Sequence, residues 1–293
     1  MSHFSVIVIG PDPEEQLEPY NEHTRVEPYF RPSNDWSINF AKEKLQLIGN
    51  RDPTPEEIAE FLSEKWDDEH LVENGVVGQM STYNPLSKWD WYVLGGRWTG
   101  YFPLKPGTSG KAGSPGLMTN PAPSGYADAA LLRDIDVERA RSEAVAEARE
   151  QFAKWRTCFE QFSKRPESWE QIRDRICGVG DNFDPKQVDV AREKYHDQPV
   201  IKKWEQVSGG HFWGCPVDDY GFYEEVYVDK CRNGALVPLA IVRNGEWFER
   251  GKMGWWGVMR GENLSYEDWC VKFQEMLDEL PDDTLLSMYD CHI

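Results

Sequence analysis

The residues with the most versatile chemistry in this 293-residue chain are six cysteines and six histidines. Only two groups of them lie close in sequence, His211 with Cys215 and Cys291 with His292. Zinc sites are usually assembled from close ligand pairs on tight turns, so buried thiols and a surface histidine are favoured over a metal site. The cysteines are scattered and form no CxxC pair, which predicts reduced thiols. We therefore expect no metal and no cofactor.

Carboxylates are the other groups that could carry chemistry. Residues 55–74 hold eight acidic side chains against one basic side chain, and residues 262–290 hold nine against one. Such clusters could bind Mg²⁺ or supply a general acid and base. They could also be the solvated faces of helices, which we favour, or a negative surface that meets a basic, DNA-binding protein.

The familiar catalytic signatures are missing from the sequence. It contains no GxxxxGK[ST], HExxH or GxSxG motif, and no GxGxxG follows a predicted strand. The segment Gly95-Gly96-Arg97 could cradle an anion with its backbone N–H groups and a guanidinium. A tight turn is favoured there, because a Gly-Gly pair accepts the positive φ angles that a hairpin requires. The motifs therefore favour a binding protein over an enzyme.

The charge balance limits the kinds of partner. The chain has 51 acidic and 32 basic residues, a formal net charge of −19. Nucleic acid and anionic membranes both need cationic groups to displace their counterions, so direct contact with either is disfavoured. No apolar run approaches the ~20 residues that span a bilayer. The apolar run at 6–9 is predicted to be a strand and not a signal peptide, because no basic region precedes it.

Local signals predict an α+β body with a mixed or antiparallel sheet and packed helices. A capping box at Thr54 and Glu57 starts a helix that the Asn-Gly pair at 74–75 ends, and Ser265 caps a last helix. The Asn-Gly pair at 244–245 predicts a type I′ hairpin. The predicted strands are 3–10, two strands within 89–103 joined as a hairpin at Gly95-Gly96, 220–229, 235–243, 253–260 and 284–289.

A long helical insert interrupts this body. Between 137 and 162 the apolar or small residues recur three or four positions apart, which places them on one face of a helix. This helix is predicted from about 134 to 163, and capping signals at Ser168 and Asp184 start two more. The predicted domains are a body of residues 1–130 and 207–293 and a helical arm of residues 131–206.

The arm differs from the body in charge. It carries ten basic and ten acidic side chains between 133 and 175, so it is neutral while the body holds the negative charge. Its helix face ends in large aromatic residues, for which packing against the following helices is favoured over self-association or partner capture. The candidate residues for partner binding or for a homo-oligomer contact are the aromatic Phe152, Trp155, Phe159 and Phe162 and the acidic Asp218, Asp219, Glu224 and Glu225.

Several distinctive segments span the body from one end to the other but not the arm, and they contain no catalytic signature. The segments are MSHFSVIVIG at 1–10, QLEPY at 16–20, NPLSKWDWY at 84–92 with GGRW at 95–98, GEWFERG at 245–251 with GWWG at 254–257, and LPDDTLL at 280–286 with DCHI at 290–293. Together these segments resemble a family of uncharacterised tailed-phage proteins.

The resemblance implies a phage protein that works in the host bacterial cytoplasm. Within the family, the length and the inserted arm are similar to those of an anti-defence inhibitor that assembles around the bacterial Gabija nuclease–helicase complex and stops it from engaging DNA. The implied partner is a host defence nuclease complex, bound stoichiometrically. Two alternatives stay open: an enzyme that acts on a nucleotide with carboxylates such as Asp90 and Mg²⁺, and a non-catalytic sponge for a nucleotide or defence signalling molecule.

Overall fold

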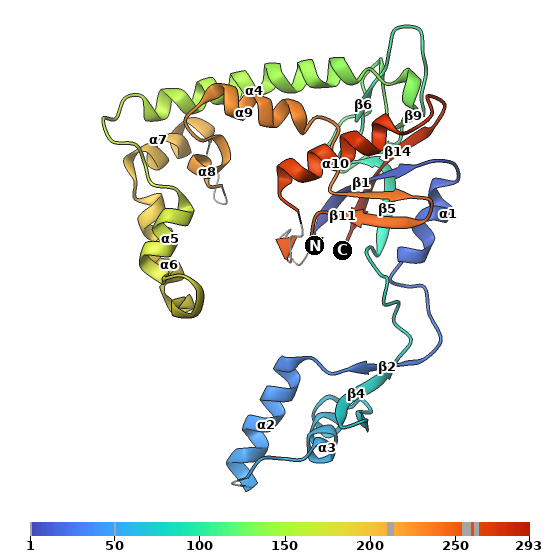
Figure 1. Ribbon diagram of the computed structural model, residues 1–293, viewed down its shortest axis with the longest axis vertical. Coiled ribbons are helices and arrows are strands. Elements are labelled where there is room, and N and C mark those ends of the chain that lie inside the picture. The colour runs from blue at the N-terminus through green and yellow to red at the C-terminus, as the bar shows by residue number, and fades with distance from the viewer. Residues whose placement is uncertain (1, 50, 210–213, 254–258, 261–263) are drawn as a thin grey trace.

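The computed structural model describes residues 2–49, 51–209, 214–253, 259–260 and 264–293. The predicted α+β class is confirmed, because a mixed seven-stranded sheet with packed helices forms the body. Figure 1 shows three parts: this sheet body, a helical arm, and a smaller lobe of residues 29–82, which we call the satellite lobe.

The main sheet is built around two strands from the two ends of the chain. Strand β1 runs antiparallel to β14 along its whole length and parallel to β10 on its other side. Hydrogen-bonded neighbours follow the order β11-β10-β1-β14-β5-β7, and β9 also pairs with β14. The strands are β1 (His3–Ile9), β5 (Trp91–Gly96), β7 (Ser114–Pro115), β9 (Ala129–Leu131), β10 (Ala240–Arg243), β11 (Glu246–Glu249) and β14 (Leu285–His292).

Both faces of β1 are covered, which explains its continuous run of β-branched residues. Ile7 and Ile9 share a core with Trp269 and Phe273 of helix α10 (Tyr266–Asp278). The alternate residues of β1 pack on the opposite face with the short helix α1 (Pro13–Leu17) and the 3₁₀ turn η1 (Glu18–Tyr20). Burial on two faces therefore anchors β1 at the centre of the sheet.

Two local predictions about the body are confirmed. Asn244 and Gly245 both have positive φ, 55° and 76°, and join β10 to β11 in an antiparallel hairpin. The Ser265 side chain accepts a hydrogen bond from the Asp268 backbone N–H at 3.0 Å and so caps α10. The single strand predicted at 253–260 is wrong, because its two ends belong to different strands, β12 (Lys252–Met253) and β13 (Met259–Arg260), which pair antiparallel with each other. Residues 254–258 lie outside the described residues.

The hairpin predicted at Gly95-Gly96 is wrong. Strand β5 pairs with β14, while β6 (Phe102–Pro103) pairs with β8 (Tyr126–Ala127). Gly95 and Gly96 have φ values of 82° and 56°, and their carbonyls accept hydrogen bonds from the Trp98 and Thr99 backbone N–H groups, so the chain turns at the end of β5. A Cβ atom on Gly96 would overlap the side chain of Asp290, so the glycine allows a close crossing and does not close a hairpin.

The satellite lobe has a core of its own. Its antiparallel sheet, in the order β2-β4-β3, packs with two helices around Ala41, Ile58 and Leu62. Two stretches of chain, one before β2 and one after β4, connect it to the sheet body (Figure 1). Its elements are β2 (Tyr29–Pro32), α2 (Asp35–Gly49), α3 (Pro55–Trp66), β3 (Leu71–Glu73) and β4 (Val76–Ser81).

The predicted start of α3 is confirmed, and its predicted end is wrong. Thr54 and Glu57 form the reciprocal hydrogen bonds of a capping box. The helix ends at Trp66, where Asp67 takes the left-handed conformation. The Asn-Gly pair at 74–75 instead forms the turn between β3 and β4, with φ values of 52° and 78°.

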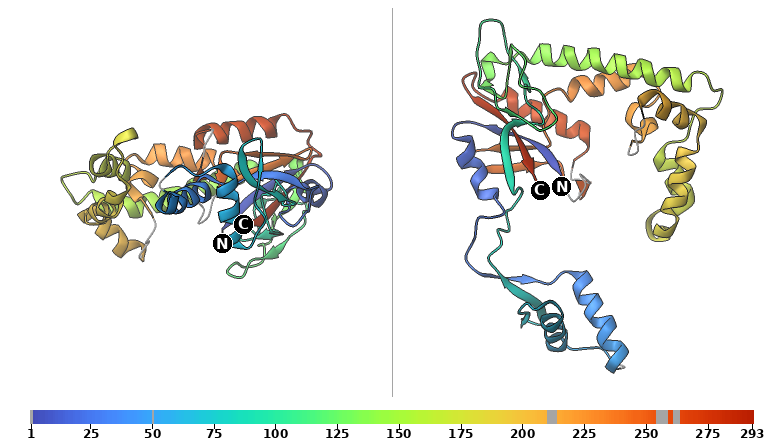
Figure 2. Two further views of the ribbon diagram at one scale, coloured as in Figure 1. Left: turned by 90° about the horizontal axis from the view of Figure 1, so that it is seen from below. Right: turned by 180° about the vertical axis from the view of Figure 1, so that it is seen from behind.

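The arm begins with α4, the long helix predicted from its apolar face. Helices α4 and α9 lie side by side, and the other arm helices lie at the end of this pair that is farther from the sheet body (Figure 1, and the right view of Figure 2). The elements of the arm are η2 (Leu132–Asp134), α4 (Val137–Phe159), α5 (Trp169–Cys177), η3 (Gly180–Asn182), η4 (Pro185–Gln187), α6 (Val188–His196), α7 (Pro199–Ser208), α8 (Pro216–Tyr220) and α9 (Glu224–Asn233).

The strand predicted at 220–229 is wrong, because most of it belongs to helix α9. Its β-branched and aromatic residues favour a strand, yet packing against α4 decides the outcome. Tyr227 joins the core of the arm, and its hydroxyl donates to the Gln151 side chain of α4 at 3.0 Å. Glu224 and Glu225 in the first turn and Lys230 near the end also suit the helix dipole.

Candidate protein-binding surfaces

Two of the aromatic candidates on α4 form the core of the arm. Phe152 and Trp155 are 1% and 0% exposed. The Trp155 indole donates to the Gly221 carbonyl at 2.7 Å and meets the ring of Trp204 edge to face. Packing within the arm therefore accounts for both residues.

The other two aromatic candidates line a groove on the arm surface. Phe159 and Phe162 are half-buried and share a groove of about 780 Å³ with Phe222 and Tyr223 at the start of α9. The guanidinium of Arg165 lies over the rings of Phe222 and Tyr223, at 4.9 and 5.4 Å from their centroids. The groove thus has an apolar floor and a charged rim, which suits a protein segment.

The four acidic candidates divide between this groove and the short helix α8. Glu224 and Glu225 line the groove, and Glu224 forms an ion pair with Arg156. Asp218 accepts a hydrogen bond from the Trp169 backbone N–H at 2.8 Å and so holds the start of α5. Burial raises the pKa of Asp219, and the charge of Asp218 raises that pKa further.

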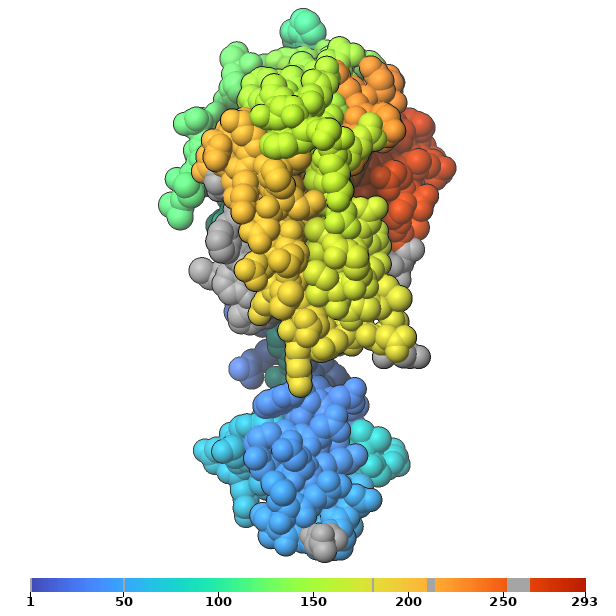
Figure 3. Space-filling model, turned by 90° about the vertical axis from the view of Figure 1, so that its left-hand side faces the viewer, coloured from blue at the N-terminus to red at the C-terminus, as the bar shows by residue number. Residues whose placement is uncertain are grey.

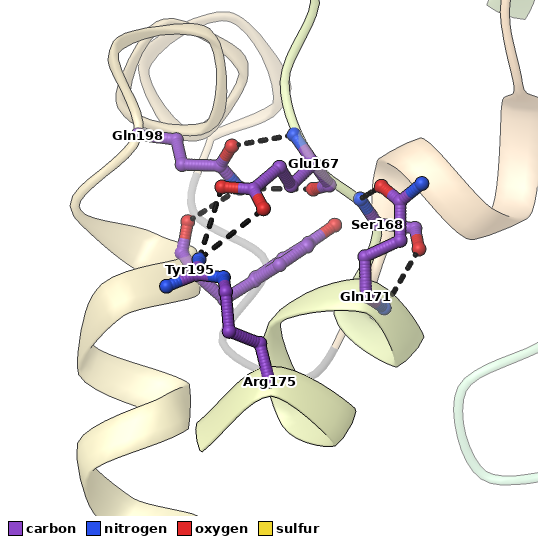
Figure 4. A network of polar contacts seen from close by, with 6 residues as sticks. All are labelled: Glu167, Ser168, Gln171, Arg175, Tyr195 and Gln198. Carbon is purple, nitrogen blue, oxygen red and sulfur yellow. Dashed lines mark hydrogen bonds and ion pairs between the residues drawn. The ribbon is translucent and has the colours of Figure 1, made fainter.

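A polar network fixes the outer helices of the arm to one another. The Gln198 side chain accepts from the Glu167 backbone N–H at 2.7 Å and donates to the Glu167 carbonyl at 3.0 Å. Ser168 and Gln171 form the predicted capping box of α5, and Arg175 pairs with the Glu167 carboxylate (Figure 4). These contacts hold the outer helices of the arm in one arrangement.

A second surface lies on the satellite lobe and consists of stacked, exposed aromatic rings. Trp36 of α2 stacks on Phe40 with centroids 5.6 Å apart and on Trp66 of α3 at 6.3 Å. Trp36 is 69% exposed and Trp66 is 38% exposed. We call Trp36, Phe40 and Trp66 the aromatic patch. Large aromatic residues exposed together are unusual on a surface that meets only water.

The lobe that carries the aromatic patch is acidic in composition. Residues 29–82 contain eleven acidic and five basic side chains, a net charge of −6. Aromatic anchors with a charged surround are a common composition of protein interfaces, whereas a nucleic-acid site needs a basic surround. The satellite lobe is thus suited to a protein partner that carries positive charge.

Sequence reasoning missed α2 and with it most of the aromatic patch. A cap signal was present, because Asn34 accepts a hydrogen bond from the Ser37 backbone N–H at 2.8 Å. The buried face was also readable, since Ile38, Ala41 and Leu45 recur at helical spacing and join the core of the lobe. The exposed aromatic residues alternate with this face and obscure its period.

The residues considered for catalysis or metal binding are placed apart from the groove. Asp90 pairs with the Nδ1 atom of His292 at 2.6 Å. All six cysteines are free thiols, and burial raises the pKa of Cys215 to about 11. Among the described residues, no three His, Cys, Asp or Glu side chains converge as a metal site. His211 lies outside the described residues.

No helix in the described part of the chain is long and apolar enough to cross a membrane. Comparison with known protein families, curated proteins and solved structures gives no match for this chain.

Proposed function

We propose that this chain is a phage-encoded inhibitor that binds a host antiviral nuclease complex stoichiometrically and blocks its access to DNA. The single observation that carries the proposal is the exposed aromatic patch on an acidic lobe held away from the sheet body. The resemblance to tailed-phage proteins selects the bacterial Gabija nuclease–helicase complex as the partner.

Burial of the aromatic patch supplies the binding energy in this proposal. Trp36 loses the most water-exposed surface when a partner covers it, since it is 69% exposed in the free chain. Covering an exposed aromatic side chain contributes roughly 2 kcal/mol, and aromatic anchors commonly dominate interfaces. The stacked rings hold one another in place, so little side-chain entropy is lost on binding.

Charge favours a partner that itself binds DNA. The negative potential of the lobe attracts the basic surface with which a nuclease contacts phosphates. An inhibitor seated on that surface excludes DNA by occupying it and by repelling the phosphates. Association should therefore slow at high salt, because screening weakens the attraction.

The arm offers a second point of attachment. Views from opposite directions show the arm and helix α2 projecting from the same side of the sheet body (Figures 1 and 2). Figure 3 looks at that side and shows the outer arm helices above the satellite lobe. Two linked contacts bind more tightly than either alone, because the second forms at a high effective concentration. We assign the arm groove to this second contact or to a homo-oligomer contact.

Size-exclusion chromatography with purified Gabija complex tests the proposal. The expected result is co-elution at low and moderate salt, together with loss of DNA cleavage by the complex. Failure to co-elute under both salt conditions would overturn it. Light scattering of the free chain reports whether it self-associates, and Phe162→Ala tests whether the arm groove carries that contact.

A further inference from the structure

Two histidines from opposite ends of the chain face each other on the main sheet. His3 of β1 lies directly opposite His292 of β14. Ser2 and Ile293 exchange both backbone hydrogen bonds at 3.0 Å, so the next pair, His3 and His292, is the non-hydrogen-bonded pair with the closer side chains. The two ring centroids are 4.9 Å apart, and the ring planes are inclined at 69°.

Each of these imidazoles is held by its own carboxylate. The Nδ1 atom of His3 lies 2.8 Å from Asp290 Oδ1, and the Nδ1 atom of His292 lies 2.6 Å from Asp90 Oδ1. Asp290 is fixed in turn, because its other oxygen accepts the Arg97 backbone N–H at 3.0 Å. A carboxylate oxygen accepts hydrogen bonds, so Nδ1 is the donor in each contact and Nε2 is the ring nitrogen left to bind a ligand.

The two Nε2 atoms have no hydrogen-bond partner in the part of the chain that the structure describes. The side chains are 19% and 14% exposed, so a small ligand can reach them. A group that binds both rings through these nitrogens is an electron-pair acceptor. A carboxylate on the far nitrogen is also the usual partner of a metal-binding histidine, because it orients the ring and raises its basicity.

The spacing fits one shared metal ion. Two imidazoles that bind one zinc ion at about 2.1 Å, with a nitrogen–metal–nitrogen angle near tetrahedral, have ring centroids roughly 5 Å apart. The observed separation is 4.9 Å. Asp90 and Asp290 together supply two negative charges behind the rings, which a divalent cation balances.

From the spacing of the two rings and the carboxylate on each Nδ1, we propose that His3 and His292 chelate a first-row divalent cation, with zinc as the best match to imidazole ligands. No third protein ligand converges on them within the described residues, so the remaining positions are open to water or to an external ligand. This site lies on the sheet body and is independent of the proposed function. A failure to bind the Gabija complex would therefore not contradict the metal site.

Titration of the full-length chain with zinc, followed by calorimetry, tests the site, and cobalt gives a visible absorption band for tetrahedral coordination. The expected result is one ion per chain, lost in His292→Gln because a single imidazole forms no chelate. Asp90→Asn, at a residue that is 31% exposed, should weaken binding about 10- to 100-fold by removing the charge behind His292.

The matched control is His196→Gln. His196 has the same Nδ1 contact with a carboxylate, Glu205 at 3.0 Å, and its ring packs edge to face on Tyr195, with no second histidine beside it among the described residues. This variant should bind zinc as the unaltered chain does. Circular dichroism shows whether each variant folds. The site is overturned if the unaltered chain binds neither ion, or if folded His292→Gln and Asp90→Asn variants both bind zinc with unchanged affinity.

Discussion

The indole of Trp36 on α2 stacks against the indole of Trp66 on α3, with centroids 6.3 Å apart and ring planes 19° apart. The contact joins the two helices of the satellite lobe on its outer surface, where Trp36 remains 69% exposed. The stack fixes the orientation of the two rings and leaves them exposed to solvent. A change at Trp36 therefore separates partner binding from folding.

Replacing Trp36 with alanine should weaken binding to the partner complex by about 2 kcal/mol or more, roughly 30-fold in Kd. The free energy of unfolding should change by no more than about 1 kcal/mol, because the side chain is mainly exposed. Calorimetry and urea unfolding measure the two quantities. Leu86→Ala is the control, since Leu86 is also exposed, at 57%, but lies outside the lobe. Equal binding by both variants would count against the aromatic patch.

Replacing Phe152 with alanine should destabilise the arm by about 3–5 kcal/mol, because its ring is buried and leaves a cavity. Phe162→Ala removes the same group from the groove surface and should cost about 1 kcal/mol. Urea unfolding followed by far-ultraviolet circular dichroism checks both values. Similar losses in the two variants would contradict the assignment of Phe152 to the core and Phe162 to the surface.

Replacing Gly96 with alanine should destabilise the sheet body by about 2–4 kcal/mol, because the added Cβ meets Asp290 and φ is positive. Gly107→Ala is the matched control. Gly107 also has a positive φ, 82°, but a Cβ there meets nothing within 4 Å. Gly107→Ala should lower the free energy of unfolding by only about 1 kcal/mol. Thermal unfolding of both variants isolates the effect of the close crossing.

Replacing Asp219 with asparagine should stabilise the arm at neutral pH. Burial raises the pKa of Asp219 in the folded chain, so its contribution to stability is present at low pH and is lost as pH rises through the raised value. Asparagine keeps the oxygen acceptor and removes the charge that partial desolvation disfavours. The gain should therefore shrink as the pH falls toward the carboxyl range. Urea unfolding at several pH values measures this gain in the free energy of unfolding. A gain that does not change with pH would exclude the raised pKa of Asp219 as its cause.

Asp189→Asn is the control for that pH series. Its side chain is 92% exposed, so removing its charge should leave the free energy of unfolding nearly unchanged at every pH.

The sequence by itself determined the features that depend on neighbours within a few residues. The capping boxes at Thr54 and Ser168, the cap at Ser265 and the hairpin at 244–245 all formed as predicted. The first strand and the long arm helix followed from their apolar patterns in the same way. Each of these signals is local, because a cap or a tight turn is complete within one turn of chain.

Only the tertiary structure decided which distant surfaces meet. The segment at 220–229 has strand-forming residues but became a helix, because α4 offered a face for it to pack against. Gly95 and Gly96 accept positive φ angles in a hairpin or in a close crossing, and the side chains of Asp128 against Gly95 and Asp290 against Gly96 leave room only for glycine in the crossing. His3 and His292 are neighbours solely because β1 pairs with β14. Residue types and local spacing do not predict such pairings, because the pairings depend on how the buried surfaces of the whole chain fit together.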